Sequence, residues 1–473
     1  MTKRLTRRSF LGSAAAIGAT LPFIKAGSLP AMAATGDLPG PEEAKINWRQ
    51  FEGTKLRFLG GLHPASANIN KLAPEFEKLT GINLTVEQIA WDAYSQKVQL
   101  DLGSQQPQYD MFLCNGGDFD WAYGPSGNLS QVQQFLDDPA LTDQAWYDLA
   151  DVDPKIVTAA SWDGVPDHRE GTGKPHVIPF MSESFMLAYR DDILQKHNVK
   201  APTTLEELLP AAKAVFDGEG GNLAAFSTRG DTDGGICNAV LINLLPNYGV
   251  RDFDDNGNSQ LATDASVRVH DILIKQIVKP LGPKSWIGTD WDTARRRFAQ
   301  GESAMFFDAD WFAGLYEDPT QSKVAGKVKY VNFGSADSKY VDYYYFGAAI
   351  NDHSANKKAA WLAAQYITSK KVMRDSAVNN RLLMPTRFST FNDAQFGKMV
   401  SSWGDGSWLA AAKANLSKWS QAAILPNDQY DQVKTVWAGA VAKMYEGAAA
   451  KDALTDAVSQ INEIMDRGGY RKG

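Results

Sequence analysis

The segment from residue 55 to residue 117 alternates short apolar runs with amphipathic stretches, and this alternation constrains the fold more than any other feature of the chain. The apolar runs are "KLRFLGG", "INLTVEQI" and "YDMFLCNGG", and the stretches between them are "NKLAPEFEKLTG" and "WDAYSQKVQLDLGSQ". Such alternation predicts parallel strands joined by crossover helices. We therefore expect an α/β lobe built on a doubly wound sheet, which binds ligands at the carboxyl ends of its strands.

The chain is too long for a single lobe of this kind. With 473 residues it should form two or more lobes, and its middle repeats the same alternation. The run "HVIPFMSESFMLAYRDDIL" contains strand-like segments. The run "TTLEELLPAAKAVFDG" begins with a threonine cap followed by two glutamates, which favours a helix start. Helical segments dominate the end of the chain, and "DDNGN" at 254–258 predicts a hairpin turn.

The first 33 residues are typical of an export signal. The arginine pair in "RRSFL" at 7–11 precedes an apolar stretch too short to span a bilayer, and "AMA" at 31–33 offers small residues for cleavage. The pair resembles the twin-arginine signal, a route that exports folded proteins. We therefore expect cleavage near Ala33 and a periplasmic or extracellular destination. Residues 34–47, rich in proline, glycine and glutamate, predict a linker.

Polar and aromatic side chains follow three predicted strand ends. "LHPASANIN" comes after the first Gly-Gly pair, "DFDWAYG" after the second, and Asp308-Ala309-Asp310-Trp311 after the apolar run 304–307. We expect Asp310 to cap the helix that follows it. The strand ends of an open α/β sheet form one crevice, so these side chains should line one cleft. Such a cleft suits a polar ligand with apolar faces, because aromatic rings cover apolar surface and carboxylates accept hydrogen bonds from polar groups.

The sequence lacks the motifs of several kinds of site. It has no G-x-S-x-G elbow, no H-E-x-x-H motif and no P-loop, and its six histidines lack metal-ligand spacing. The stretch from Asp252 begins like a calcium loop but has Thr263 where a bidentate glutamate is needed. A net charge of −7 disfavours nucleic acid as a partner. We predict no catalytic residue, no metal site and no cofactor, while paired carboxylates leave a glycosidase open.

Two smaller features have structural interpretations. Cys114 and Cys237 are the only cysteines, which leaves a disulfide open but does not make a metal site; we interpret them as buried apolar residues. The triple arginine at 295–297 predicts a solvated helix face.

Six segments carry a resemblance to a known family. They are, in order, "PEFEKLTGINLTVEQIAWDAYSQKV", "YDMFLCNGGDFDWAYGPSGNL", "GKPHVIPFMSESFMLAYRDDIL", "APTTLEELLPAAKAV", "FAQGESAMFFDADWFAG" and "NKKAAWLAAQYITSKKV". From about residue 55 to residue 468 the chain resembles the family-1 extracellular solute-binding proteins, which capture substrate for ABC sugar importers. It is similar in layout to maltose-binding protein.

The resemblance implies a two-lobe periplasmic-binding-protein fold with a ligand cleft between the lobes, which close by a hinge. It places chain crossings near residues 181–183, 344–347 and 380–385. The implied lobes are 48–181 plus 347–380 at the N-terminal side, and 182–346 plus 381–473 at the C-terminal side.

The resemblance also assigns roles to single residues. Asp118 would offer a carboxylate to sugar hydroxyls, Glu183 would accept hydroxyl hydrogen bonds at the hinge, and Trp311 would stack on the sugar. Phe346 holds a place where many members carry tryptophan, and Phe119 replaces a polar residue of the maltose binder. Further candidates come from strand ends, helix starts and the loop "TRGDTDGG": His63, Asn68, Trp91, Arg229, Asp231, Tyr345 and Tyr430. The alternatives are core packing for Trp311, a cap for Asp118 and an ion pair for Glu183.

These observations favour a carbohydrate-binding transport component that is not an enzyme. It would capture an oligosaccharide, glycoside or polyol and deliver it, as a monomer, to ABC permease subunits in the inner membrane. The alternatives are a binder of a phosphate ester or polyamine and an exported glycosidase. A phosphate ester would require clustered arginines, and Arg229 and Arg387 are separated in sequence.

Overall fold

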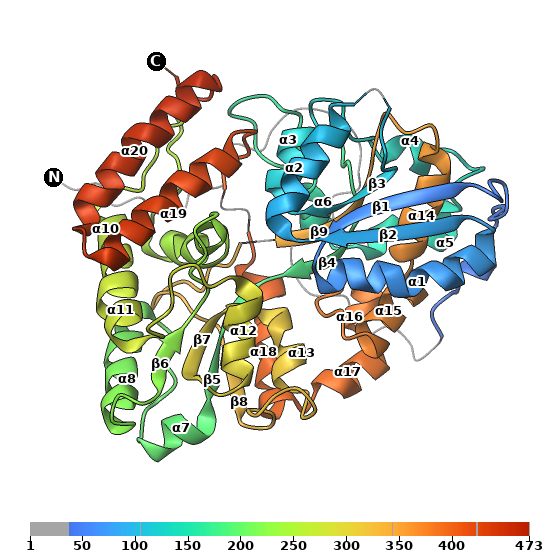
Figure 1. The fold of residues 1–473 in the computed structure, drawn as a ribbon. Helices are drawn as coiled ribbons and strands as arrows, with labels where there is room; N and C mark the ends of the chain where they lie inside the picture. The colour runs from blue at the N-terminus through green and yellow to red at the C-terminus, as the bar shows by residue number, and fades with distance from the viewer. Residues whose placement is uncertain (1–36, 105, 343, 422–423, 473) are drawn as a thin grey trace.

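The computed structural model describes residues 37–104, 106–342, 344–421 and 424–472, so the predicted export signal lies outside the described residues. The described chain forms two β-sheets, each with its own helices (Figure 1). We call the five-stranded sheet with its helices the first lobe and the four-stranded sheet with its helices the second lobe.

The first lobe is built on strands in the order β2-β1-β3-β9-β4. The first three are parallel, as the alternation predicted, and β9 runs antiparallel to both β3 and β4. The strands are β1 (Lys55–Gly61), β2 (Asn83–Ile89), β3 (Met111–Asn115), β4 (Pro179–Glu183) and β9 (Tyr344–Ile350). The main helices are α1 (Pro64–Thr80), α2 (Trp91–Leu102), α3 (Gly117–Tyr123), α6 (Pro154–Ala159), α14 (Lys357–Ile367) and α15 (Lys370–Asn379).

The second lobe is built on strands in the order β6-β7-β5-β8, with β5 antiparallel to both neighbours. The strands are β5 (Phe185–Arg190), β6 (Ala224–Ser227), β7 (Ser303–Ala309) and β8 (Val328–Val331). The main helices are α7 (Asp191–Lys196), α8 (Leu205–Gly218), α10 (Asp264–His270), α12 (Trp291–Ala299), α13 (Ala313–Tyr316), α18 (Ser407–Ala414), α19 (Tyr430–Glu446) and α20 (Ala450–Arg467), with π-helical segments at Ile236–Leu241 and Asp271–Val278.

The passage from β4 to β5 joins the lobes through one residue, Ser184. The chain returns to the first sheet at β9, and later residues 384–387 pair with Ser182, Met181 and Val152 of the first lobe. It reaches the second lobe again after α17 (Ala394–Val400), where Trp403–Gly406 and α18 pack on β8. The lobe boundaries given above stay predictions.

Local sequence explains the helix starts, and one expectation was wrong. Thr204 caps α8 through a 3.1 Å hydrogen bond from the Glu207 amide, as predicted. The helix after β1 was expected in the stretch "NKLAPEFEKLTG", from Asn70, but α1 begins at Pro64. Proline suits the first helical position, and His63 Nδ1 accepts a hydrogen bond from the Ala65 amide, so the helix starts before its amphipathic part.

Two glycines at predicted strand ends make room for aromatic rings. A Cβ on Gly61 would lie 2.6 Å from the Trp91 ring, and a Cβ on Gly116 would lie 2.5 Å from the Tyr344 ring. Gly116 also has a φ of 91°, which side-chain-bearing residues rarely adopt. The Gly-Gly pairs thus let the sheet edge approach these rings.

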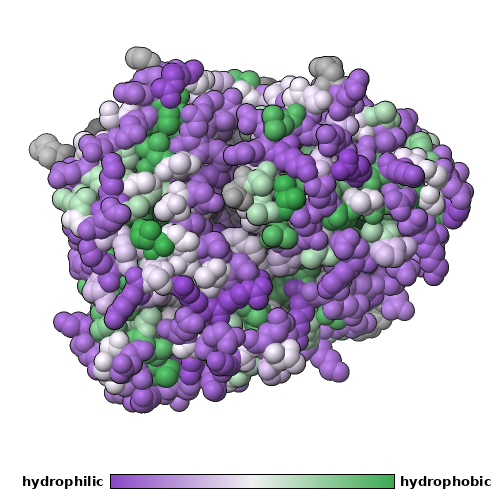
Figure 2. Space-filling view, in the orientation of Figure 1, coloured by the Kyte–Doolittle hydropathy of each residue, from purple (hydrophilic) through white to green (hydrophobic). Residues whose placement is uncertain are grey.

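The surface is largely polar and is hollowed between the two lobes, as Figure 2 shows on one face. Residues 40–44 of the predicted linker lie against the first lobe, where the Gly40 and Pro41 carbonyls accept hydrogen bonds from Trp146 and Trp48. Cys114 and Cys237 are buried and unpaired. None of the described helices is long and apolar enough to cross a membrane.

Candidate functional site

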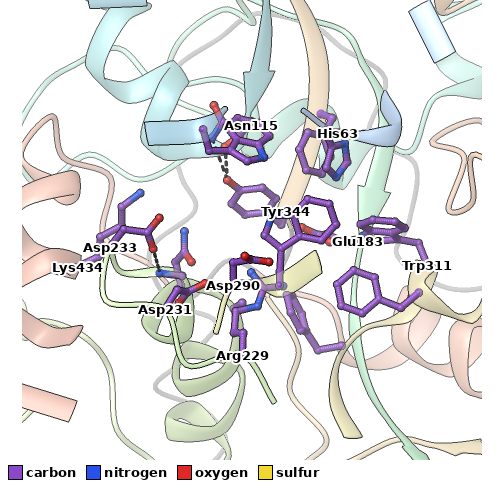
Figure 3. A pocket seen from close by; sticks show the side chains of 18 of the residues that line it. His63, Asn115, Glu183, Arg229, Asp231, Asp233, Asp290, Trp311, Tyr344 and Lys434 are labelled. Carbon is purple, nitrogen blue, oxygen red and sulfur yellow. Dashed lines mark hydrogen bonds between the residues drawn. The ribbon is translucent and has the colours of Figure 1, made fainter. Parts of the chain in front are cut away.

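A cavity of about 200 Å³ lies between the lobes, beside the carboxyl ends of β1 and β3 and the start of β9. Its walls come from both lobes, and Figure 3 shows His63 and Asn115 facing Arg229, Asp231 and Asp290 across it. The strand-end rule therefore located a cavity correctly from sequence. Whether each wall residue contacts a ligand stays a prediction.

The first-lobe wall is uncharged apart from Glu183 at the crossing. It is formed by His63, Trp91, Ser95, Asn115, Tyr344 and Phe346. Burial, together with Arg295, lowers the pKa of His63 to about 3, so its imidazole is neutral. Because Nδ1 accepts the Ala65 amide, the proton of the neutral ring belongs on Nε2. The Trp91 Nε1–H is buried without an acceptor among the described residues, so it remains available to donate a hydrogen bond.

The second-lobe wall carries most of the charge. It presents Arg229, Asp231, Asp233, Asp290 and Lys434, together with aromatic rings. Arg229 donates to both carboxylate oxygens of Asp308, one of them at 2.9 Å. Asp231 accepts a hydrogen bond from the Ile236 amide, and Asp290 accepts from the Thr293 amide at the start of α12. These contacts lie within the second lobe, so they fix the charged groups independently of the other lobe.

Asp308, Asp310 and Trp311 at the end of β7 have three separate roles. Asp308 pairs with Arg229, and the Trp311 Nε1–H donates to Glu183 at the crossing. Asp310 does not cap the following helix as expected; its carboxylate accepts a hydrogen bond from Ser184, the single residue between the sheets. Burial raises the pKa of Asp310 to about 8, more than the hydrogen bond from Ser184 lowers it. Only Trp311 of the three lines the cavity.

Two carboxyl groups on the cavity wall have pKa values close to neutral pH. Burial raises the pKa of Glu183 to about 7, against the opposing effects of Arg229 and the Trp311 hydrogen bond. Burial also raises the pKa of Asp231 to about 7, with Arg229 opposing and Asp233 reinforcing the change. Each can therefore serve as a hydrogen-bond acceptor whose strength changes near neutral pH.

The lobes touch at both ends of the cavity, and Figure 3 shows Trp311 and Lys434 at opposite ends. At one end the His63 ring centroid lies 5.2 Å from that of Trp311 and 5.3 Å from that of Trp291. At the other end Lys434 Nζ lies 2.7 Å from an Asp118 carboxylate oxygen. The described structure is therefore a closed arrangement.

Arg295 is buried, whereas the triple arginine was expected to form a solvated helix face. It is 8% exposed, and its guanidinium lies 5.1 Å from the Trp291 ring centroid and 5.2 Å from that of Trp311. Asp292 on the same helix pairs with it. The side chain is buried because its stem and planar head pack on the aromatic end of the cavity.

The structure brings most of the predicted ligand-binding residues together. His63, Trp91, Glu183, Arg229, Asp231, Trp311 and Phe346 line the cavity. The others do not line it. Asn68 lies inside α1, bonded to Ser376 and Asn380, and Phe119 packs against Tyr94 and Tyr123. Asp118, Tyr345 and Tyr430 surround a smaller neighbouring void instead.

Several wall residues were missed by sequence reasoning. Asn115 stands beside a predicted strand end, so the strand-end rule could have included it, and Tyr344 falls in the chain crossing expected near residues 344–347. Asp290 and Trp291 stand at the start of a helix whose sequence is mostly charged. Asp233 lies in the same loop as Arg229, which was among the candidates. Lys434 follows Tyr430 by one helical turn on α19, but nothing local indicates that it crosses to the first lobe. Among the described residues no cluster of acidic, histidine or cysteine side chains could hold a metal.

Known proteins resemble this chain over most of its length. It is 26% identical over 460 residues to the erythritol/L-threitol-binding protein of Mycolicibacterium smegmatis, covering 96% of this chain and 95% of the relative. It is 25% identical over 317 residues to the mannitol-binding protein of Pseudomonas aeruginosa, covering 63% of this chain and 66% of the relative.

Solved structures share its fold. A solute-binding protein of Agrobacterium radiobacter K84 in complex with ribitol superposes with a TM-score of 0.75 at 23% identity, over 87% of this chain and 99% of that one. One from Agrobacterium vitis S4 with bound D-mannitol gives 0.74 at 22% identity, over 89% and 100%. The sequence profile of the family described as bacterial extracellular solute-binding protein matches residues 60–374, well over half of the chain. The closed two-lobe architecture agrees with the family profile. The chain therefore belongs to the bacterial extracellular solute-binding proteins.

Proposed function

We propose that this protein captures a short acyclic polyol, or a monosaccharide of similar size, for an ABC importer. The observation that carries the proposal is the cavity itself, which is lined by carboxylates and aromatic rings and ends at a contact between the lobes on each side. A ligand with a hydroxyl on nearly every carbon can donate to several carboxylates at once, while its C–H groups pack on rings.

The donors and acceptors of the cavity suit such a ligand. Glu183, Asp231, Asp233 and Asp290 offer carboxylate oxygens, and the Trp91 Nε1–H offers a donor that has no acceptor among the described residues. The contacts at both ends disfavour a long oligosaccharide. The polyol ligands in the names of the relatives and solved structures support the same class of substrate.

The chemistry of the wall argues against a phosphate ester. Arg229 is neutralised by Asp308 and Lys434 by Asp118, so the wall presents a surplus of carboxylates. That surplus would repel a phosphate. It would attract a polyamine, which is therefore the second candidate and belongs in any ligand screen.

The remaining aspects follow the family. We propose that the protein works in the periplasm as a monomer and hands its ligand to permease subunits of the inner membrane. Export by the twin-arginine route, cleavage near Ala33 and the absence of catalytic activity are parts of the same proposal.

A thermal-shift screen tests the ligand class. We expect erythritol, ribitol or D-mannitol to raise the melting temperature, since a ligand at about 100 times its Kd stabilises the native state by about 2.7 kcal/mol. Maltose, spermidine and glycerol 3-phosphate serve as the oligosaccharide, polyamine and phosphate-ester comparisons. A shift with one of these three and none with the polyols would overturn the proposal, and titration calorimetry of the best ligand would give its affinity.

A further inference from the structure

Asp118 and Lys434 form an ion pair that joins the two lobes. Asp118 belongs to α3 of the first lobe and Lys434 to α19 of the second, and their charged atoms are 2.7 Å apart. The side chains are 6% and 14% exposed. A second inter-lobe pair, between Lys472 and Asp167, is far more exposed, so water screens it. The buried pair therefore has the larger effect on the relative energies of open and closed lobes.

The second lobe holds Lys434 ready for this contact. Its stem lies over Gly234, where a Cβ would come within 2.3 Å of the Lys434 side chain. Asp431, one turn earlier on α19, also contacts the ammonium, at 2.5 Å. Lys434 thus keeps a carboxylate partner on its own helix whether the lobes are open or closed.

Asp118 depends on closure in a different way. Burial raises the pKa of Asp118, more than the Lys434 ammonium lowers it. Lys434 is the largest influence that opposes this rise, and the carboxylate exchanges that ammonium for water when the lobes separate. Asp118 lies outside the wall of the cavity, whereas Lys434 is part of that wall, so the pair ends the cavity without Asp118 touching its contents.

We propose that Asp118 is a positioning residue, which holds Lys434 and the second lobe over the ligand and so sets the closing equilibrium and the affinity. Asp431 opposes it, because it competes for Lys434 in the open state and repels Asp118 in the closed one. The effect on affinity rests on the proposed function, but the effect on closure needs no ligand.

Small-angle scattering of the ligand-free full-length mature protein tests closure directly. We expect Asp118→Asn to increase the radius of gyration and Asp431→Asn to leave it equal or smaller. Lys370→Met is the matched control, because Lys370 pairs with Asp148 at 2.7 Å within the first lobe. It should leave the radius unchanged. An unchanged radius for Asp118→Asn, or one that increases equally in the control, would overturn the proposal.

Calorimetry with ribitol and D-mannitol adds a readout that simple destabilisation would not produce. Asp118→Asn should weaken binding by at least about tenfold, and Asp431→Asn should tighten it about two- to fivefold. Weaker binding in both variants would contradict the competition between the two carboxylates. If no polyol binds the parent protein but the radii change as expected, the proposed function fails and the closing role of the pair stands.

Discussion

The two walls of the cavity differ in how they are built. The first-lobe wall is neutral apart from Glu183 at the crossing, and its rings fit against strand-end glycines. The second-lobe wall carries Arg229, three aspartates and Lys434, which are held by partners such as Asp308 and backbone amides. The charged wall is thus organised before closure, whereas the neutral wall acts by covering it. A ligand that meets the open protein would find its hydrogen-bonding partners in the second lobe and lose its water when the first lobe closes.

The largest expected effect comes from removing the ion pair between Arg229 and Asp308 behind the charged wall. Arg229→Met removes the only cation that contacts Asp308 among the described side chains, and Asp308 is 1% exposed. Leaving a buried carboxylate unpaired should cost about 3–5 kcal/mol of unfolding free energy, measured by urea denaturation. Asp308→Asn in the same chain should recover part of the loss. A cost below about 1 kcal/mol would mean that water reaches Asp308 and that the wall is not preorganised.

The next effect concerns the aromatic end, where the two walls meet. Trp311→Ala removes a ring in contact with His63 and the donor to Glu183, so affinity for the polyol should fall by about 2–4 kcal/mol in calorimetry. Trp286 is the control, since it is 1% exposed and outside the cavity wall. Trp286→Ala should lower stability by about 3–5 kcal/mol, while the folded fraction binds normally. Normal binding by Trp311→Ala would place that ring among core residues.

The smallest expected effect is a pH dependence that should come from Glu183 and Asp231. The pKa of Glu183 and of Asp231 is raised to about 7 in the folded protein, so the free energy of unfolding should fall as pH rises from about 4 through 7. Affinity should rise over the same range, by up to about tenfold per group, because ionised carboxylates accept hydroxyl hydrogen bonds better. His63 on the neutral wall, with a pKa of about 3, should not contribute. The double variant Glu183→Gln/Asp231→Asn should flatten the pH dependence of both stability and affinity. If both dependences stayed unchanged, other groups would be responsible for them.

Sequence reasoning succeeded where a property is local. Alternating apolar runs predicted the parallel strands, and strand ends led to His63 and Trp311 on the cavity wall, while Trp91 was a candidate because it opens a helix. It failed where a contact joins distant parts of the chain. Asp118 and Lys434 are 316 residues apart, and no local pattern indicates that they meet. Asn68 was misplaced because a cap and a proline extended α1 beyond its amphipathic part.

The tryptophans around the cavity have an optical consequence. Trp91, Trp291 and Trp311 stand on its wall, and the Trp311 indole touches a carboxylate, whereas Trp361, Trp408 and Trp437 are packed in the core. Indole emission moves to shorter wavelength when water leaves the ring and is quenched by suitably placed acidic groups. Filling the cavity therefore changes the fluorescence of the wall tryptophans over a constant background from the core, and the protein reports its own occupancy without a label.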